Sequence, residues 1–170
     1  ERLARPDALD RALAVLALGG CVRAPPLPTV EEAVGALPLD AVGPWRPERT
    51  RGRVTVITFI ATWCFPCLVD LPVLTRLQAD HPDTVVVVLV GMDLEGRKVL
   101  EPFAAVNTLT LPLVVGDDAL RGGQTPFGQI RELPTRFVFG ADGRIAFAYT
   151  GVAEPKDLIE AVERQRIAGD

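Results

Sequence analysis

Two cysteines with two residues between them, Cys64 and Cys67, are the side chains of this sequence best suited to chemistry. They follow an apolar, β-branched run at residues 54–60 and open a segment with helical periodicity. The first turn of a helix has unpaired N–H groups and partial positive charge, and both favour a thiolate at Cys64. Cys67 lies one turn further along the same face, so it can attack a mixed disulfide formed at Cys64. The spacing therefore predicts a redox-active pair.

Two other interpretations of the pair stay open. A structural zinc site needs about four ligands, and outside the pair this chain offers the thiol of Cys21 and the imidazole of His81. The two cysteines could instead be inert core residues, but a position at a helix start, between Trp63 and Pro66, argues against that. We expect a site without metal or cofactor, with Cys21 outside the redox pair.

The composition indicates a single α/β domain. Hydrophobic residues make up 48% of the 170 positions, which is enough to bury a sizeable core. The formal net charge is −4 and there is no long run of Lys or Arg, so the sequence does not show the basic surface typical of nucleic-acid binding. No stretch approaches the roughly 20 apolar residues of a membrane-spanning helix. We expect a soluble monomer.

The hydrophobic pattern then gives the elements that must position the pair. Strands are predicted at residues 54–60, 85–90, 113–115, 136–139 and 145–149, with a further short strand at 37–39. Helices are predicted at 64–80, 95–106 and from Pro155 onward, the last with Leu158, Ile159 and Val162 on its apolar face. Strands that alternate with helices, followed by a hairpin and a last helix, predict a mixed central sheet flanked by helices on both faces.

The N-terminal segment has two interpretations. We divide the chain into residues 1–36, an N-terminal helix and irregular lead-in, and a domain at residues 37–170. The apolar run at residues 12–18 could end a lipoprotein signal in which Cys21 carries the lipid, which would imply membrane anchoring upstream of the domain. It could instead belong to a helix over residues 7–18, which the acidic residues of this segment favour because the leading region of a signal is normally basic.

Three short segments resemble a known family. Residues 59–67 (FIATWCFPC) with 70–72 (DLP) look like the active-site signature of TlpA/ResA-like proteins, which are extracytoplasmic members of the thioredoxin superfamily. The resemblance resumes at residues 128–135 (GQIRELPT). It implies a thioredoxin-like fold with an extra helix and strand, matched by residues 91–118, between the Cys-x-x-Cys helix and a cis-proline.

The resemblance also implies roles for individual residues. Cys64 would attack a partner disulfide and Cys67 would resolve the mixed disulfide. Partner proteins would dock on a groove shaped by a cis-proline and its neighbours, matched here by Trp63, Phe65, Leu133 and Pro134.

One position departs from the family pattern. Thr58 stands where thioredoxins carry a buried Asp and this family often has Asn. A proton acceptor for Cys67 must then come from elsewhere, and Asp70 stands where relatives often have Glu. We expect Asp70 to be catalytic, and the alternative is a solvated residue on the helix surface.

These features together predict a thiol–disulfide oxidoreductase that reduces disulfides of exported partner proteins and is recharged by an upstream thiol reductant. Reduction is favoured over oxidation because residues 65 and 66 include no His that would stabilise the reduced thiolate. The resemblance implies a periplasmic location, or one anchored to the membrane and facing outward, and a role such as cytochrome c biogenesis. The alternative functions are a binding module of the same fold or a metallochaperone without turnover. A peroxiredoxin is disfavoured because Ala61 stands where its Thr is required.

Overall fold

A mixed sheet forms the centre of the protein. The computed structural model describes residues 27–152 and 154–167. Within these residues the sheet has six strands in the order β1-β4-β3-β2-β5-β6. Their bounds are β1 Ala41–Val42, β2 Val54–Ile60, β3 Val85–Gly91, β4 Leu113–Val115, β5 Thr135–Phe139 and β6 Ile145–Thr150. Strands β2, β3 and β4 are parallel, while β5 runs antiparallel to β2, and β6 to β5. The predicted α/β fold with a mixed sheet is confirmed.

The two central strands are apolar along their whole length because both of their faces are covered. Every residue of β2 and of β3 is buried, as expected for strands between two layers of helix. The helices are α2 Val30–Gly35, the 3₁₀ helix η2 Pro47–Thr50, α3 Phe65–Asp80, α4 Arg97–Val106, α5 Asp118–Arg121 and α6 Pro155–Ile167.

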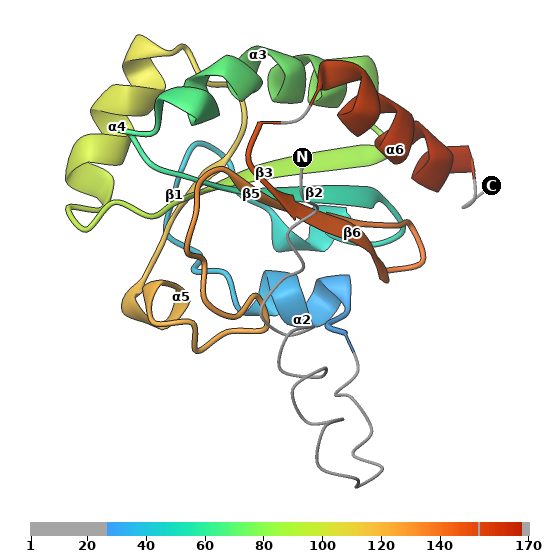
Figure 1. Ribbon diagram of the computed structural model, residues 1–170, viewed down its shortest axis with the longest axis horizontal. Coiled ribbons are helices and arrows are strands. Elements are labelled where there is room, and N and C mark those ends of the chain that lie inside the picture. The colour runs from blue at the N-terminus through green and yellow to red at the C-terminus, as the bar shows by residue number, and fades with distance from the viewer. Residues whose placement is uncertain (1–26, 153, 168–170) are drawn as a thin grey trace, which may run out of the picture.

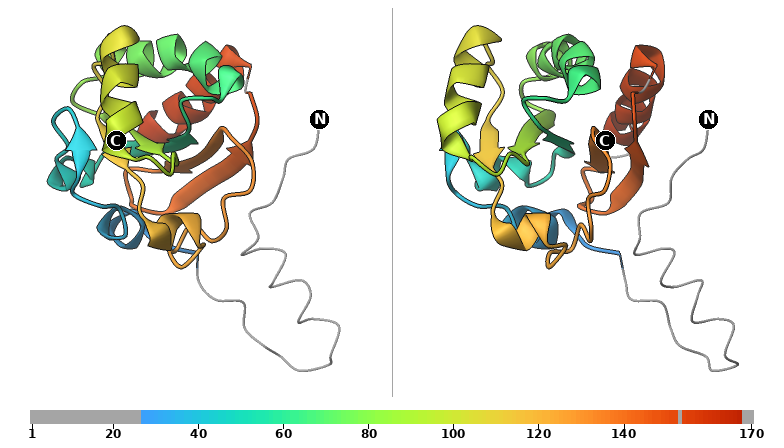
Figure 2. Two further views of the ribbon diagram at one scale, coloured as in Figure 1. Left: turned by 90° about the vertical axis from the view of Figure 1, so that its left-hand side faces the viewer. Right: turned by 60° about the vertical axis from the view of Figure 1, so that its left-hand side comes forward.

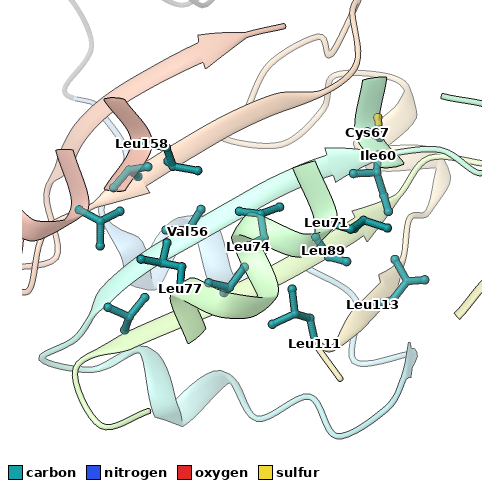
Figure 3. Close-up of a cluster of buried hydrophobic side chains, with 14 of the residues drawn as sticks. Val56, Ile60, Cys67, Leu71, Leu74, Leu77, Leu89, Leu111, Leu113 and Leu158 are labelled. Atoms are coloured by element: carbon teal, nitrogen blue, oxygen red, sulfur yellow. The ribbon is translucent and has the colours of Figure 1, made fainter. Parts of the chain in front are cut away.

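Helices α3, α4 and α6 cover one face of the sheet, and α2 and α5 cover the other (Figures 1 and 2). Beneath α3, its apolar residues Leu71, Leu74 and Leu77 pack on alternate residues of β2, β3 and β4, and Leu158 of α6 joins the same core (Figure 3). A second core on the opposite face contains three phenylalanine rings in edge-to-face contact, Phe59, Phe127 and Phe137. The two cores fix the sheet from both sides.

Helix α2 is a structural element that the sequence analysis did not predict. It lies in the segment interpreted as an irregular lead-in, and three of its residues are buried. The signal was a capping box, in which Thr29 accepts a hydrogen bond from the Glu32 N–H and the Glu32 carboxylate accepts one from the Thr29 N–H. The expected short strand at residues 37–39 is absent, and β1 pairs with β4 from residue 41. The domain boundary after residue 36 stays a prediction.

Two other predictions concern the ends of the chain. In α6, Leu158 and Val162 are buried as expected, but Ile159 is 39% exposed, and Ala161 is buried instead. The predicted helix at residues 7–18 and Cys21 lie outside the described residues. Among the described helices, none combines the length and the apolar character that crossing a membrane requires.

Candidate active site

A disulfide joins Cys64 to Cys67 where strand β2 is followed by helix α3. Strand β2 ends at Ile60, a short turn follows, and Cys64 is the N-cap residue of α3. The Cys67 N–H, in the first turn of α3, donates both to the backbone oxygen of Cys64 at 3.0 Å and to Cys64 Sγ at 3.2 Å. The backbone dipoles of α3 therefore act directly on the sulfur of Cys64 and would stabilise its thiolate after reduction.

The disulfide is covered, and its neighbours in the chain are exposed. Cys64 and Cys67 are 4% and 1% accessible, whereas Trp63 and Phe65 are each 74% exposed. The exposure of the two cysteines differs little in this disulfide form, so the assignment of Cys64 as the nucleophile depends on its position at the helix start. The aromatic side chains provide an apolar surface beside the buried sulfurs.

A buried carboxylate holds the turn that leads to the disulfide. Asp93, 2% accessible, follows β3 and accepts hydrogen bonds from the Thr62 N–H at 3.0 Å and the Thr62 hydroxyl at 2.6 Å. Arg121 in α5 donates to the backbone oxygens of Asp93 and Gly116. The sequence analysis missed Asp93. Its signal was a carboxylate two residues after the end of the buried strand β3, which is parallel to β2, so both strands end at the same edge of the sheet.

The Leu133–Pro134 peptide bond is cis, as the family resemblance implied. Pro134 is buried, and its carbonyl oxygen accepts a hydrogen bond from the Gly151 N–H at 2.8 Å. Leu133 packs against the core cluster that contains both cysteines. Within residues 27–152 and 154–167, the backbone N–H and C=O of Leu133 make no hydrogen bond. These two backbone groups of Leu133 are therefore available to pair with another chain.

Asp70 is a core residue, which excludes the alternative of a solvated residue on the helix surface. It is 5% accessible and forms an ion pair with Arg136 of β5, whose side chain is fully buried. Burial raises the pKa of Asp70 above its ordinary value, and the positive charge of Arg136 opposes this rise. Asp70 stands three residues after Cys67 on α3, so both face the sheet.

Arg136 and Tyr149 complete this buried group, and the sequence analysis missed both. Another amino group of Arg136 donates to the Tyr149 hydroxyl, and the guanidinium carbon lies 5.1 Å from the centre of the Tyr149 ring. Burial also raises the pKa of Tyr149. The sequence signal for Arg136 was the alternation of side chains along a strand. Residues 136 and 138 share a face of β5, and Val138 is in the core beneath α3, so Arg136 faces the same side of the sheet.

The fold and the site together define a protein of the thioredoxin superfamily: a thioredoxin-like sheet, a Cys-x-x-Cys disulfide at the start of a helix, and a cis-proline before β5. No family model matches the sequence. Among curated proteins, the chain is 29% identical over 116 residues to sporulation thiol-disulfide oxidoreductase A of Bacillus subtilis. It is 28% identical over 115 residues to the thiol-disulfide oxidoreductase ResA of Geobacillus thermodenitrificans. Each match takes in 66% of this chain, and the chain spans 68% and 63% of the respective relatives.

Among solved structures, StoA from Bacillus subtilis is similar with a TM-score of 0.55 and 29% identity, over 65% of this chain and 83% of StoA. Within the thioredoxin superfamily the chain is TlpA/ResA-like, and this prediction is confirmed. Residues 91–118, where the resemblance implied an extra helix and strand, contain α4 at residues 97–106 and β4 at residues 113–115.

Proposed function

We propose that this protein is a thiol–disulfide oxidoreductase that reduces disulfides of exported partner proteins. The observation that carries the proposal is the Cys64–Cys67 disulfide at the N-terminus of α3, with a backbone N–H directed at Cys64 Sγ. The names of the relatives in the comparisons support the reaction class.

The reaction starts from the reduced pair. The Cys64 thiolate attacks one sulfur of the partner disulfide, so a Cys64–partner mixed disulfide forms and the first partner sulfur leaves as a thiolate. Cys67 then loses its proton and attacks Cys64 Sγ, which forms the Cys64–Cys67 disulfide and releases the second partner sulfur. Two electrons pass from the protein to the partner, whose thiolates take up the two protons. An upstream thiol reductant restores the dithiol.

The proton of Cys67 must be accepted inside the protein, and we assign this role to Asp70. Thr58, on strand β2 beneath α3, has a buried hydroxyl and no carboxylate. Asp70 supplies the carboxylate from the helix instead, and its raised pKa brings it closer to the range useful for a general base.

The partner would bind across the exposed aromatic residues and the free peptide group of Leu133. Trp63 and Phe65 offer apolar contact, and an extended partner segment could pair with the Leu133 backbone beside Pro134. Val69 and Leu94, 55% and 82% exposed, extend the apolar character around the site, since Val69 is one turn after Phe65 and Leu94 adjoins Asp93.

The proposal includes an extracytoplasmic location, in the periplasm or anchored to a membrane and facing outward, and a physiological role such as cytochrome c biogenesis. The family resemblance supports both. Anchoring would depend on the segment that contains Cys21, outside the described residues.

An insulin-reduction assay with trapping tests the proposed function. With dithiothreitol as reductant, the protein should accelerate insulin reduction, and Cys64→Ser should abolish the acceleration. Cys67→Ser should accumulate a mixed disulfide between Cys64 and the B or A chain of insulin, visible by mass spectrometry. A Cys64→Ser variant that retains the wild-type rate would contradict the proposal.

A further inference from the structure

The ion pair beneath α3 joins the proton acceptor to a residue of the hairpin. Arg136 lies opposite Thr58 on β2 and opposite Tyr149 on β6, and its guanidinium reaches Asp70 on the helix above. It is fully buried, as is Thr58. Thus a permanent positive charge occupies the strand layer beneath Asp70, next to the strand position from which other thioredoxins supply a carboxylate.

A carboxylate in this place could not stay charged without a partner. Transfer from water into a protein interior disfavours ionised groups, and a buried Asp without compensation takes up a proton instead. A protonated Asp70 could not accept the proton of Cys67. The opposite charge of Arg136 counteracts the effect of burial on the Asp70 pKa.

We propose that Arg136 is a positioning residue for the resolving step: it holds Asp70 as an oriented carboxylate one helical turn from Cys67. The inference rests on the proposed function, in which Asp70 is the proton acceptor. Arg136 touches neither partner nor reacting sulfur in this mechanism, and acts through Asp70. Its other contact, with Tyr149, fixes the guanidinium from the far side.

Among the residues that the structure describes, four titratable groups apart from Tyr149 either form the disulfide on α3 or act electrostatically on Asp70 or its neighbour Tyr149: Cys64, Cys67, Arg136 and Asp157. The cysteines lie at the start of α3, Arg136 on β5 and Tyr149 on β6. From α6, Asp157 acts electrostatically on Tyr149. Among the described charged residues, Arg136 is the one that acts directly on Asp70, so the effect of its removal can be assigned.

Stopped-flow kinetics with an aromatic nitrobenzoate disulfide separate the two steps. Attack by Cys64 on this probe releases one coloured thiolate, and resolution by Cys67 releases the second. In Arg136→Met, we expect the midpoint of the pH profile of the second phase to move upward by about one to three units. Below the new midpoint, resolution should slow about tenfold for each unit. The first phase should change less.

Four further variants make the outcome specific. Arg136→Lys keeps the charge and should restore most of the midpoint, and it also provides a test if Arg136→Met does not fold. Asp70→Asn should flatten the profile, and the double variant Asp70→Asn/Arg136→Met should match it. Arg76→Met, which removes an exposed arginine of the same helix, should leave the profile unchanged.

The outcomes distinguish the two claims. A wild-type profile in Asp70→Asn would overturn Asp70 as the proton acceptor, and with it the proposed function of this residue. Two results would overturn the role of Arg136 alone. The first is an altered pH profile in Asp70→Asn together with a wild-type midpoint in folded Arg136→Met. The second is an Arg136→Lys midpoint far above that of the wild type. Carbon NMR of the Asp70 carboxyl provides a readout independent of turnover, since its pKa should rise in Arg136→Met.

Discussion

The sulfur of Cys64 lies at the first turn of α3, and the Cys67 N–H donates to it as well as to the Cys64 backbone oxygen. This contact distinguishes the two cysteines, although both are buried. Ionisation of Cys64 is favoured by the backbone N–H and the helix dipole. Cys67 lies three residues further along α3, where the helix dipole favours a thiolate less than it does at the helix start.

This difference predicts the order of alkylation. In the reduced protein at neutral pH, iodoacetamide should label Cys64 faster than Cys67, because the thiolate is the reacting form. Timed quenching followed by peptide mass mapping gives both rates. Faster labelling of Cys67 would show that the nucleophile has been assigned wrongly.

Burial of Asp70 predicts a pH effect on stability. Its pKa is higher in the folded protein than the ordinary value of 3.8, so the folded state retains this proton to higher pH than the unfolded state. The contribution of Asp70 to stability is therefore greatest below the unfolded-state pKa and is lost as pH rises through the folded-state pKa.

Urea unfolding of the wild type and of Asp70→Asn between about pH 3 and about pH 8 tests this pH effect, because the range begins below the ordinary Asp pKa and extends well above it. As pH rises through the folded-state pKa of Asp70, the free energy of unfolding of the wild type should fall relative to that of Asp70→Asn. A difference independent of pH would contradict the raised pKa.

The loop after β3 supports the active-site turn from a neighbouring element. Asp93 satisfies two donors of Thr62, so Asp93→Ala should leave buried polar groups unpaired and cost about 1–3 kcal/mol of stability. Thr62→Val is the matched control, because it removes the hydroxyl and keeps the backbone N–H. Chemical denaturation measures both. A loss in Asp93→Ala no larger than in Thr62→Val would contradict the role given to the backbone contact.

Elements with strong local signals could be predicted from sequence, and elements that depend on tertiary contacts could not. The apolar β-branched runs gave β2 and β4 with the observed ends, and Cys64 and Cys67 were found by their spacing. Arg136 sits in an otherwise apolar strand, and its ion pair with Asp70 joins residues 66 positions apart. Sequence spacing indicates nothing about such a contact until the register of β5 against β2 is known. Helix α2 is short, so periodicity gave little signal, although its capping box was readable.

On the scale of the whole molecule, two cores on opposite faces of the sheet hold the fold, and the Cys64–Cys67 disulfide closes a very short loop at its edge. A short loop restricts the unfolded chain little. The disulfide is therefore suited to reversible chemistry, and the fold is expected to persist when it is reduced.

Because aromatic residues are exposed around the disulfide, we expect mutation there to affect the reduction of large and small disulfide substrates differently. Trp63→Ala should raise the KM for a protein disulfide at least several-fold, because it removes apolar contact area, and should change the rate with a small aromatic disulfide much less. Val106→Ala, at the end of α4 and 83% exposed, is the control and should affect neither. Equal losses with both substrates would argue against docking on Trp63.

The central claim is that Cys64 and Cys67 form a reversible redox pair in a fold that does not depend on their disulfide. The most direct test is equilibration across a glutathione redox series, followed by differential alkylation, mass mapping and circular dichroism. We predict a single two-electron transition that interconverts the Cys64–Cys67 disulfide and the dithiol, with Cys21 outside the pair and the spectrum of the folded protein retained in the reduced form. A disulfide between Cys21 and Cys64, or loss of the folded spectrum on reduction, would contradict the account.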